Sequence, residues 1–134
     1  MSKTKVLVKI KGNCNVNPNG EMIVKYLIDG LENNSVTYFD IIESKYGNTL
    51  LKAEYTALNM ALERLLELNM TATDIELQTV SYMIFMHSKG YMCPNNGHYK
   101  DEAFKAKKLM NRFTNLKIEQ VDKFDLTDLD NIKN

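Results

Sequence analysis

Hydrophobic and polar residues alternate through the first third of the chain, and this alternation predicts strands. In residues 5–11 every second side chain is apolar and shares one side, while lysines occupy much of the other side. Residues 22–28 and 36–42 form two further strand-like runs. Turn-forming residues at 12–20 and 29–35 separate the three runs. We therefore expect a three-stranded antiparallel meander.

The apolar spacing then changes to that of a helix. From Leu51 to Leu68 the apolar residues fall on one stripe of a helix, and Glu54 lies on the same stripe. Thr49 is a suitable N-cap for this helix, which should end near Asn69.

The second half of the chain holds shorter segments of both kinds. We expect strands at 74–79 and 116–121, helices at 81–89 and 101–113, and a segment 122–134 that is a polar tail or a short terminal helix. A meander followed by alternating helix and strand implies a mixed sheet with helices packed on it. With 134 residues and 44% hydrophobic content, residues 1–134 are expected to form a single domain.

Composition and charge narrow the function only slightly. The chain has no apolar run of about 18 residues and no secretory leader pattern at its start, so we expect a soluble, cytoplasmic protein without a membrane partner. Its 17 basic and 17 acidic residues cancel, so binding of nucleic acid would need a local basic patch.

The cysteines and histidines lack the paired spacing of a structural zinc site. Cys93 and His98 form at most half a site, and a buried thiol and a surface imidazole explain them better. His87 and His98 could serve as general acids or bases, but a surface position is the favoured interpretation for both.

Several segments, in the right order, resemble type 1 ribonuclease H. Residues 11–14 (Lys-Gly-Asn-Cys) and 17–20 (Asn-Pro-Asn-Gly) resemble that family's Asp-Gly-Ser-Cys and Asn-Pro-Gly-x-Gly. Residues 48–58 resemble its Asn-Thr-Asn-Asn-x-Ala-Glu-x-x-Ala-Leu. Residues 79–81 (Thr-Val-Ser) stand at its Ser/Thr-Asp-Ser, and 121–130 stand at its last helix. The resemblance implies an α/β, ribonuclease H-like fold: a five-stranded mixed sheet with antiparallel strands 1 to 3, parallel strands 4 and 5, and flanking helices.

The resemblance also implies four acidic positions, because that family hydrolyses phosphodiesters with two divalent metals held by carboxylates. These positions fall on Lys11, Glu54, Val80 and Asp130. Lys11 and Val80 have therefore lost the metal ligand, since an ammonium repels cations and an isopropyl group cannot coordinate them. Glu54 and Asp130 remain as catalytic remnants that would hold Mg²⁺ or Mn²⁺ only if the protein is active; otherwise no cofactor is expected.

Glu54 needs an explanation on an apolar helix stripe, where a bare carboxylate is costly. It is either a remnant metal ligand or the partner of Lys11 in an ion pair. We favour the ion pair, because charge compensation would account for both unusual residues and would make Lys11 a structural replacement for magnesium.

Two groups of residues are candidates for binding nucleic acid. Lys105, Lys108 and Arg112 make the second long helix basic, although a solvated helix face explains them as well. Asn13 and Asn15 lie beside the first acidic position, although asparagine is also common in tight turns.

The sequence leaves two function classes open. In the favoured one, the fold is a non-catalytic platform for nucleic acid (an RNA/DNA hybrid or duplex) or for a protein partner, including a second copy of the chain. The alternative is an active, metal-dependent nuclease for RNA/DNA hybrids that uses Glu54, Asp130 and a third acid such as Asp74 or Glu76. Only the nuclease requires three or more carboxylates within about 5 Å of one point.

Overall fold

The alternating segments at the start of the chain form three consecutive antiparallel strands in the computed structural model, which describes residues 5–31, 34–91 and 97–132. They are β1 (Lys5–Cys14), β2 (Met22–Leu31) and β3 (Asn34–Ile42). β1 is longer than predicted, because its apolar alternation continues to the buried Cys14, which pairs with Met22. The predicted meander is confirmed.

Two further strands complete the predicted mixed sheet. β4 (Asp74–Thr79) runs parallel to β1, and β5 (Leu116–Gln120) runs parallel to β4. The strand order is β3-β2-β1-β4-β5, so β1 lies at the centre of the sheet. The carboxyl ends of β1 and β4 therefore meet at one edge, where loops and helix starts can bring side chains together.

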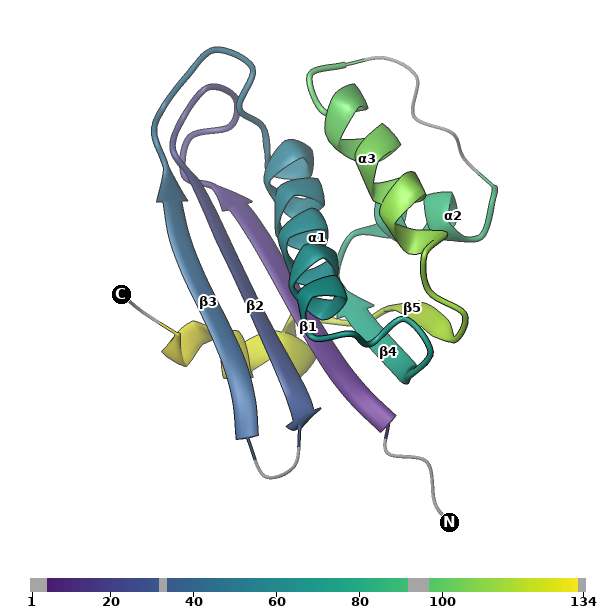
Figure 1. Ribbon diagram of the computed structural model, residues 1–134. Coiled ribbons are helices and arrows are strands. Elements are labelled where there is room, and N and C mark those ends of the chain that lie inside the picture. The colour runs from purple at the N-terminus through teal and green to yellow at the C-terminus, as the bar shows by residue number, and fades with distance from the viewer. Residues whose placement is uncertain (1–4, 32–33, 92–96, 133–134) are drawn as a thin grey trace.

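The helices lie where the periodicity predicts them. They are α1 (Leu50–Glu67), α2 (Tyr82–Ser88) and α3 (Lys100–Met110). Thr49 caps α1 by accepting a hydrogen bond from the backbone N–H of Lys52 at 3.1 Å. α1 covers one face of the sheet, and α3 packs against α1. Figure 1 shows α1 in front of the strands and α3 beside it.

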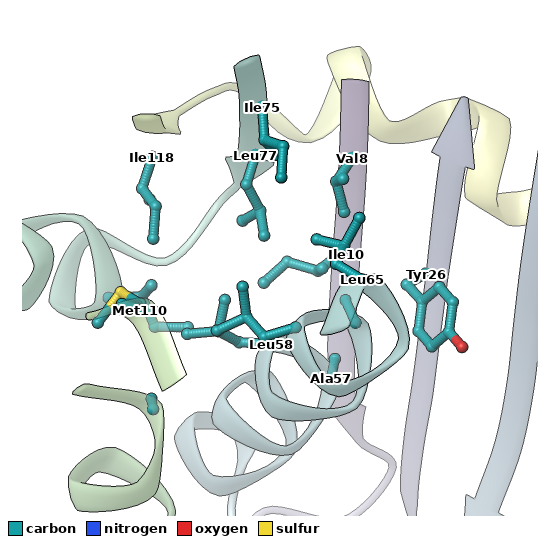
Figure 2. Close-up of a cluster of buried hydrophobic side chains, with 14 of the residues drawn as sticks. Val8, Ile10, Tyr26, Ala57, Leu58, Leu65, Ile75, Leu77, Met110 and Ile118 are labelled. Atoms are coloured by element: carbon teal, nitrogen blue, oxygen red, sulfur yellow. The ribbon is translucent and has the colours of Figure 1, made fainter. Parts of the chain in front are cut away.

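A close-packed core fills the space between the sheet and α1. Val8 and Ile10 of β1 meet Leu58 and Leu65 of α1, and all four are at most 1% exposed (Figure 2). The even-numbered residues of β1 face α1, so the odd-numbered residues point to the opposite face of the sheet.

The C-terminal segment crosses that opposite face as a 3₁₀ helix, η1 (Lys123–Asn131), shown in yellow in Figure 1. Asp122 and Asp125 form a capping box at its start. Leu126 and Leu129 are at most 1% exposed, and this burial holds the segment on β1 and β2. Of the two interpretations of residues 122–134, the short terminal helix is confirmed for 123–131.

Gly12 sets the contact between β1 and α1. A β-carbon at this position would collide with the backbone of Ala53 and Glu54, so only glycine lets the strand and the helix touch here. This contact fixes Glu54 beside the carboxyl end of β1.

In the part of the chain that the structure describes, no helix is long and apolar enough to span a membrane.

Candidate functional site

Lys11 and Asp130 meet on the η1 face of the sheet. The ammonium of Lys11 lies 3.2 Å from Oδ1 of Asp130. The structure therefore brings together the first and fourth positions that sequence comparison assigned to metal ligands. Both side chains keep solvent contact, at 37% and 57% exposure, so this ion pair contributes at most about 1 kcal/mol to stability.

Two more lysines of the sheet bind η1, one through an ion pair and one through a hydrogen bond. Lys9 Nζ lies 2.8 Å from Oδ2 of Asp128, and Lys25 Nζ donates to the carbonyl oxygen of Leu129 at 3.2 Å. We call Lys9, Lys11 and Lys25 the lysine row. The row faces consecutive residues of η1, so this end of the chain is fixed over the candidate site by charge as well as by its buried leucines.

Glu54 belongs to α1, on the other side of β1, where the helix backbone lies against Gly12. It is 8% exposed, and it has no hydrogen-bond or ion-pair partner among the residues that the structure describes. Burial raises the pKa of its carboxyl group to about 7. The predicted Lys11–Glu54 ion pair is wrong, because the alternation of β1 directs Lys11 to the face opposite α1.

The third position supplies no ligand. Val80 follows the last residue of β4 and is half-buried. Its neighbours serve the backbone: Thr79 accepts a hydrogen bond from the N–H of Ser81 at 3.0 Å, and Ser81 caps α2 through the N–H of Ile84 at 3.2 Å. The apolar side chain of Val80 thus stands at the position that the resemblance assigned to the third carboxylate.

The acids suggested as replacements do not lie near Lys11. Asp74 pairs with Lys5 in the sheet register, at the opposite end of β1 from Lys11. Glu76 forms an ion pair with Lys5 at 2.7 Å, and that ion pair lowers the pKa of its carboxyl group. Strands rise about 3.3 Å per residue, so four residues place Glu76 roughly 13 Å along β4 from Val80. Neither acid can supply the third ligand.

These residues do not fit the two divalent cations of a ribonuclease H. Among residues 5–31, 34–91 and 97–132, no three His, Cys, Asp or Glu side chains are grouped so that they could hold a metal ion. Lys11 places a positive charge at the centre of the site, and Asp130 is already bound to it.

The asparagines near the site mostly stabilise the loop after β1. Asn13 Oδ1 accepts from the N–H of Cys14 at 2.9 Å, and Asn15 Nδ2 donates to Glu21 at 3.1 Å. Asn17 Oδ1 accepts from the N–H of Leu50 at 3.2 Å, which ties the loop to the start of α1. Asn13 and Asn15 remain exposed, so the prediction that they bind nucleic acid stays a prediction.

The basic residues of α3 have differing surroundings. Lys105 forms an ion pair with Glu63 of α1 at 3.3 Å, and Lys108 lies over the ring of Phe104 at 4.6 Å. Arg112 follows the helix and is exposed. The charge of Lys105 is therefore compensated, which leaves Lys108 and Arg112 as the stronger candidates for contact with an anion.

The two histidines differ. His98 is exposed, as predicted, and its ring meets the edge of Tyr46. His87 is 6% exposed, so the prediction of a surface position is wrong for this residue. It packs against α1, where its Nδ1 lies 2.9 Å from the hydroxyl of Tyr55. Burial, with a smaller effect of Lys107, lowers the pKa of His87. Cys93 lies outside the described residues.

Lys25 is the residue that sequence reasoning missed. Lys25 of β2 lies directly opposite Lys11 of β1 in the antiparallel register, although 14 positions separate the two in the chain. The alternation of residues 22–28 does put Lys25 on the polar side of β2. Its pairing with Lys11 depends on the register, which the loop length sets and the sequence pattern does not.

Solved structures with a similar fold include ribonucleases H. The chain matches ribonuclease H1 of Halobacterium salinarum at 24% identity and TM-score 0.79, covering 94% of this chain and 92% of that one. The N-terminal ribonuclease H domain of a Mycobacterium tuberculosis protein matches at 19% identity and TM-score 0.81, covering 94% and 93%. The ribonuclease H1 called LC11, isolated from compost and solved in complex with an RNA/DNA hybrid, matches at 22% identity and TM-score 0.80, covering 93% and 91%.

Neither a scan against protein-family models nor a search of the curated proteins finds a match. At identities below 25%, the structural similarity establishes the fold and not the activity. The chain has a ribonuclease H-like fold, with the sheet order and flanking helices that the resemblance implied.

Proposed function

We propose that this chain, as a ribonuclease H-like domain, binds nucleic acid duplexes such as an RNA/DNA hybrid and does not cleave them. One observation carries the proposal: the ammonium of Lys11 is bound to Asp130 at the place where such a nuclease needs a metal ion. The positive charge that would meet the phosphate backbone thus comes from a side chain.

The loss of cleavage follows from the chemistry of the site. Hydrolysis by two metals needs cations that activate the attacking water and stabilise the leaving oxygen. An ammonium can neutralise a phosphate, but it cannot lower the pKa of a bound water as a divalent cation does. Lys11 and Val80 remove two ligand positions, Asp130 is bound to Lys11, and Glu54 is only 8% exposed.

The proposal that nucleic acid is the ligand rests on likeness and on surface chemistry. LC11 ribonuclease H1, which has the same fold, is solved with an RNA/DNA hybrid. Lys11, Asn13 and Asn15 lie together at the end of β1 and can all donate hydrogen bonds to phosphate or sugar oxygens. Because the chain has no net charge, we expect modest affinity, with a salt dependence set by the few phosphates that its local lysines contact.

The test is to measure binding and cleavage of one labelled RNA/DNA hybrid with Mg²⁺ or Mn²⁺. We expect binding without cleavage for the unmodified protein. The control is Glu54→Gln, which removes the best-placed carboxylate while keeping its size. Cleavage that this substitution abolishes would disprove the non-cleaving part of the proposal; cleavage that persists unchanged would belong to a contaminating nuclease. Absence of binding to the hybrid would disprove the proposed function.

A further inference from the structure

Lys11 and Lys25 face each other directly across two antiparallel strands. The register pairs Lys11 with Lys25 and Asn13 with Ile23, so these four residues form two neighbouring cross-strand pairs. All four point to the η1 face, because they alternate with the buried residues of β1 and β2. Like charges directly opposite each other in a sheet are unfavourable unless an anion lies between them.

The acids of η1 do not balance the lysine row. Lys9 pairs with Asp128 and Lys11 pairs with Asp130, so two carboxylates serve three ammonium groups. Lys25 donates only to the neutral carbonyl of Leu129 and lies 5.4 Å above the ring of Phe39. Among the residues that the structure describes, Lys25 has no carboxylate partner, and one positive charge is left over.

A small hollow opens between these residues. It has a volume of about 100 Å³ and is lined by Lys11, Asn13, Ile23 and Lys25. That exceeds the roughly 15 Å³ that a single water needs, so the hollow can take a tetrahedral oxyanion. We call it the lysine hollow.

The polar groups of the lysine hollow are donors. Each ammonium has three N–H donors, and the hydrogen bonds described above use one donor of Lys11 and one of Lys25. The carbonyl oxygen of Asn13 already accepts from the N–H of Cys14, which leaves its NH₂ group for a ligand. Among the described residues, no carboxylate lines the hollow. Such a lining suits an anion with several acceptor oxygens and repels a metal cation.

We infer that the lysine hollow binds one phosphate of a nucleic-acid backbone directly, without a metal ion, and that Lys25 is the residue that completes the site. This inference rests on the proposed function and adds to it the place and chemistry of one phosphate contact. Lys25 neutralises the phosphate with its charge, which no described carboxylate pairs. Lys11 stays paired with Asp130 and donates a further N–H to the phosphate, and the amide of Asn13 donates to a third oxygen. Ile23 closes the hollow with an apolar wall.

The test compares Lys25→Gln with Lys9→Gln in binding a labelled RNA/DNA hybrid in EDTA. Lys9 is a matched control, because it belongs to the same row and the same sheet face but does not line the hollow. We expect the unmodified protein to bind equally well with EDTA and with Mg²⁺. Lys25→Gln should weaken binding about tenfold and reduce the salt slope by about 1, whereas Lys9→Gln should leave both nearly unchanged.

A second variant guards against a loss of folding in Lys25→Gln. Asn13→Asp places a carboxylate at an exposed position in the hollow and should weaken binding at least as strongly, with an unchanged melting temperature. If both variants bind as well as the unmodified protein, or if binding requires Mg²⁺, the lysine hollow is not the phosphate site, while the proposed function stands.

A failure of the proposed function can be distinguished from a failure of the phosphate site. If the unmodified protein does not bind the hybrid, the proposed function fails, and inorganic phosphate then tests the hollow alone. Amide chemical-shift changes on phosphate addition that cluster at Lys11, Asn13, Ile23 and Lys25 would support an anion site with another source of phosphate. Shifts that are absent, or spread over other lysines, would overturn it.

Discussion

The hydroxyl of Tyr55 and Nδ1 of His87 lie 2.9 Å apart in the core, where they join α1 to α2. The two rings meet edge to face, with centroids 5.9 Å apart, and Tyr55 also stacks on Tyr99. Tyr55 is fully buried. Its neighbour in the helix, Glu54, is 8% exposed, and no hydrogen bond of its carboxylate is found among the described residues.

Removal of the Tyr55 hydroxyl should therefore destabilise the protein. In Tyr55→Phe, the buried Nδ1 of His87 loses its partner, which costs about 1 to 3 kcal/mol. Urea denaturation at pH 8 measures the change. Tyr99→Phe is a suitable control, because Tyr99 stacks on Tyr55 but no hydrogen bond of its hydroxyl is found among the described residues. Equal stability of Tyr55→Phe and the unmodified protein would show that the hydrogen bond contributes nothing.

Glu54 should make the stability of the folded protein depend on pH. Burial raises its pKa to about 7 in the folded state, from 4.5 for the free side chain. The folded protein thus binds a proton more tightly than the unfolded chain, so stability falls as the pH rises from about 4.5 to about 7. A difference of this size corresponds to a penalty on the order of 3 kcal/mol above pH 7.

Glu54→Gln isolates this effect, because glutamine has the size of the protonated acid and no charge. We expect the variant to gain stability relative to the unmodified protein at pH 8 and to gain little at pH 4.5. Urea denaturation of both proteins at the two pH values gives the difference directly. The same relative stability at both pH values would mean that Glu54 is charged in the fold and has a partner.

His87 should act in the opposite direction. Burial lowers its pKa below 6.5, so the unfolded chain takes up a proton that the folded protein resists. Its contribution is fully present above pH 6.5 and is lost progressively as the pH falls from that value toward the lower pKa of the folded state. A titration of the His87 ring by NMR should show a midpoint below 6.5. A midpoint at or above 6.5 would contradict the buried, neutral imidazole.

Gly12 should tolerate no side chain. Gly12→Ala places a β-carbon against the backbone of Ala53 and Glu54, and neither strand nor helix can move without breaking the core. We expect a loss of about 3 kcal/mol or failure to fold. Gly90→Ala is the contrasting control: its β-carbon would meet nothing within 4 Å, and only its φ of +80° is unfavourable, at about 1 to 2 kcal/mol. Thermal melting of both variants ranks them, and a smaller loss for Gly12→Ala would contradict the close contact.

The sequence was sufficient for the elements of the fold and for some contacts of the site. Alternation in β1 and the helical stripe of α1 predicted both elements, and the alternation also implied that Lys11 points away from α1. The predicted Lys11–Glu54 ion pair was wrong because the prediction used only the opposite charges of the two residues and ignored the direction in which β1 points the side chain of Lys11. The burial of His87 could not be predicted, since α2 has only seven residues and too few turns to show which side is covered.

Replacement of Lys11 tests whether its ammonium group prevents a divalent metal ion from binding at the site. Lys11→Asp combined with Val80→Asp returns carboxylates to both lost positions, and the one at position 11 lies where the side chain of Lys11 now meets Asp130. Several carboxylates around one point bind divalent cations, whereas the ammonium of Lys11 repels them. We expect Mn²⁺ to broaden the amide signals of Gly12 and Asp130 in the double variant and to leave those signals unchanged in the unmodified protein.

Lys9→Asp with Val80→Asp adds the same charge away from the site and should behave like the unmodified protein. Broadening of the same signals in the unmodified protein would mean that a metal binds despite Lys11, and the side chain would then not be the substitute for magnesium on which the non-cleaving function depends.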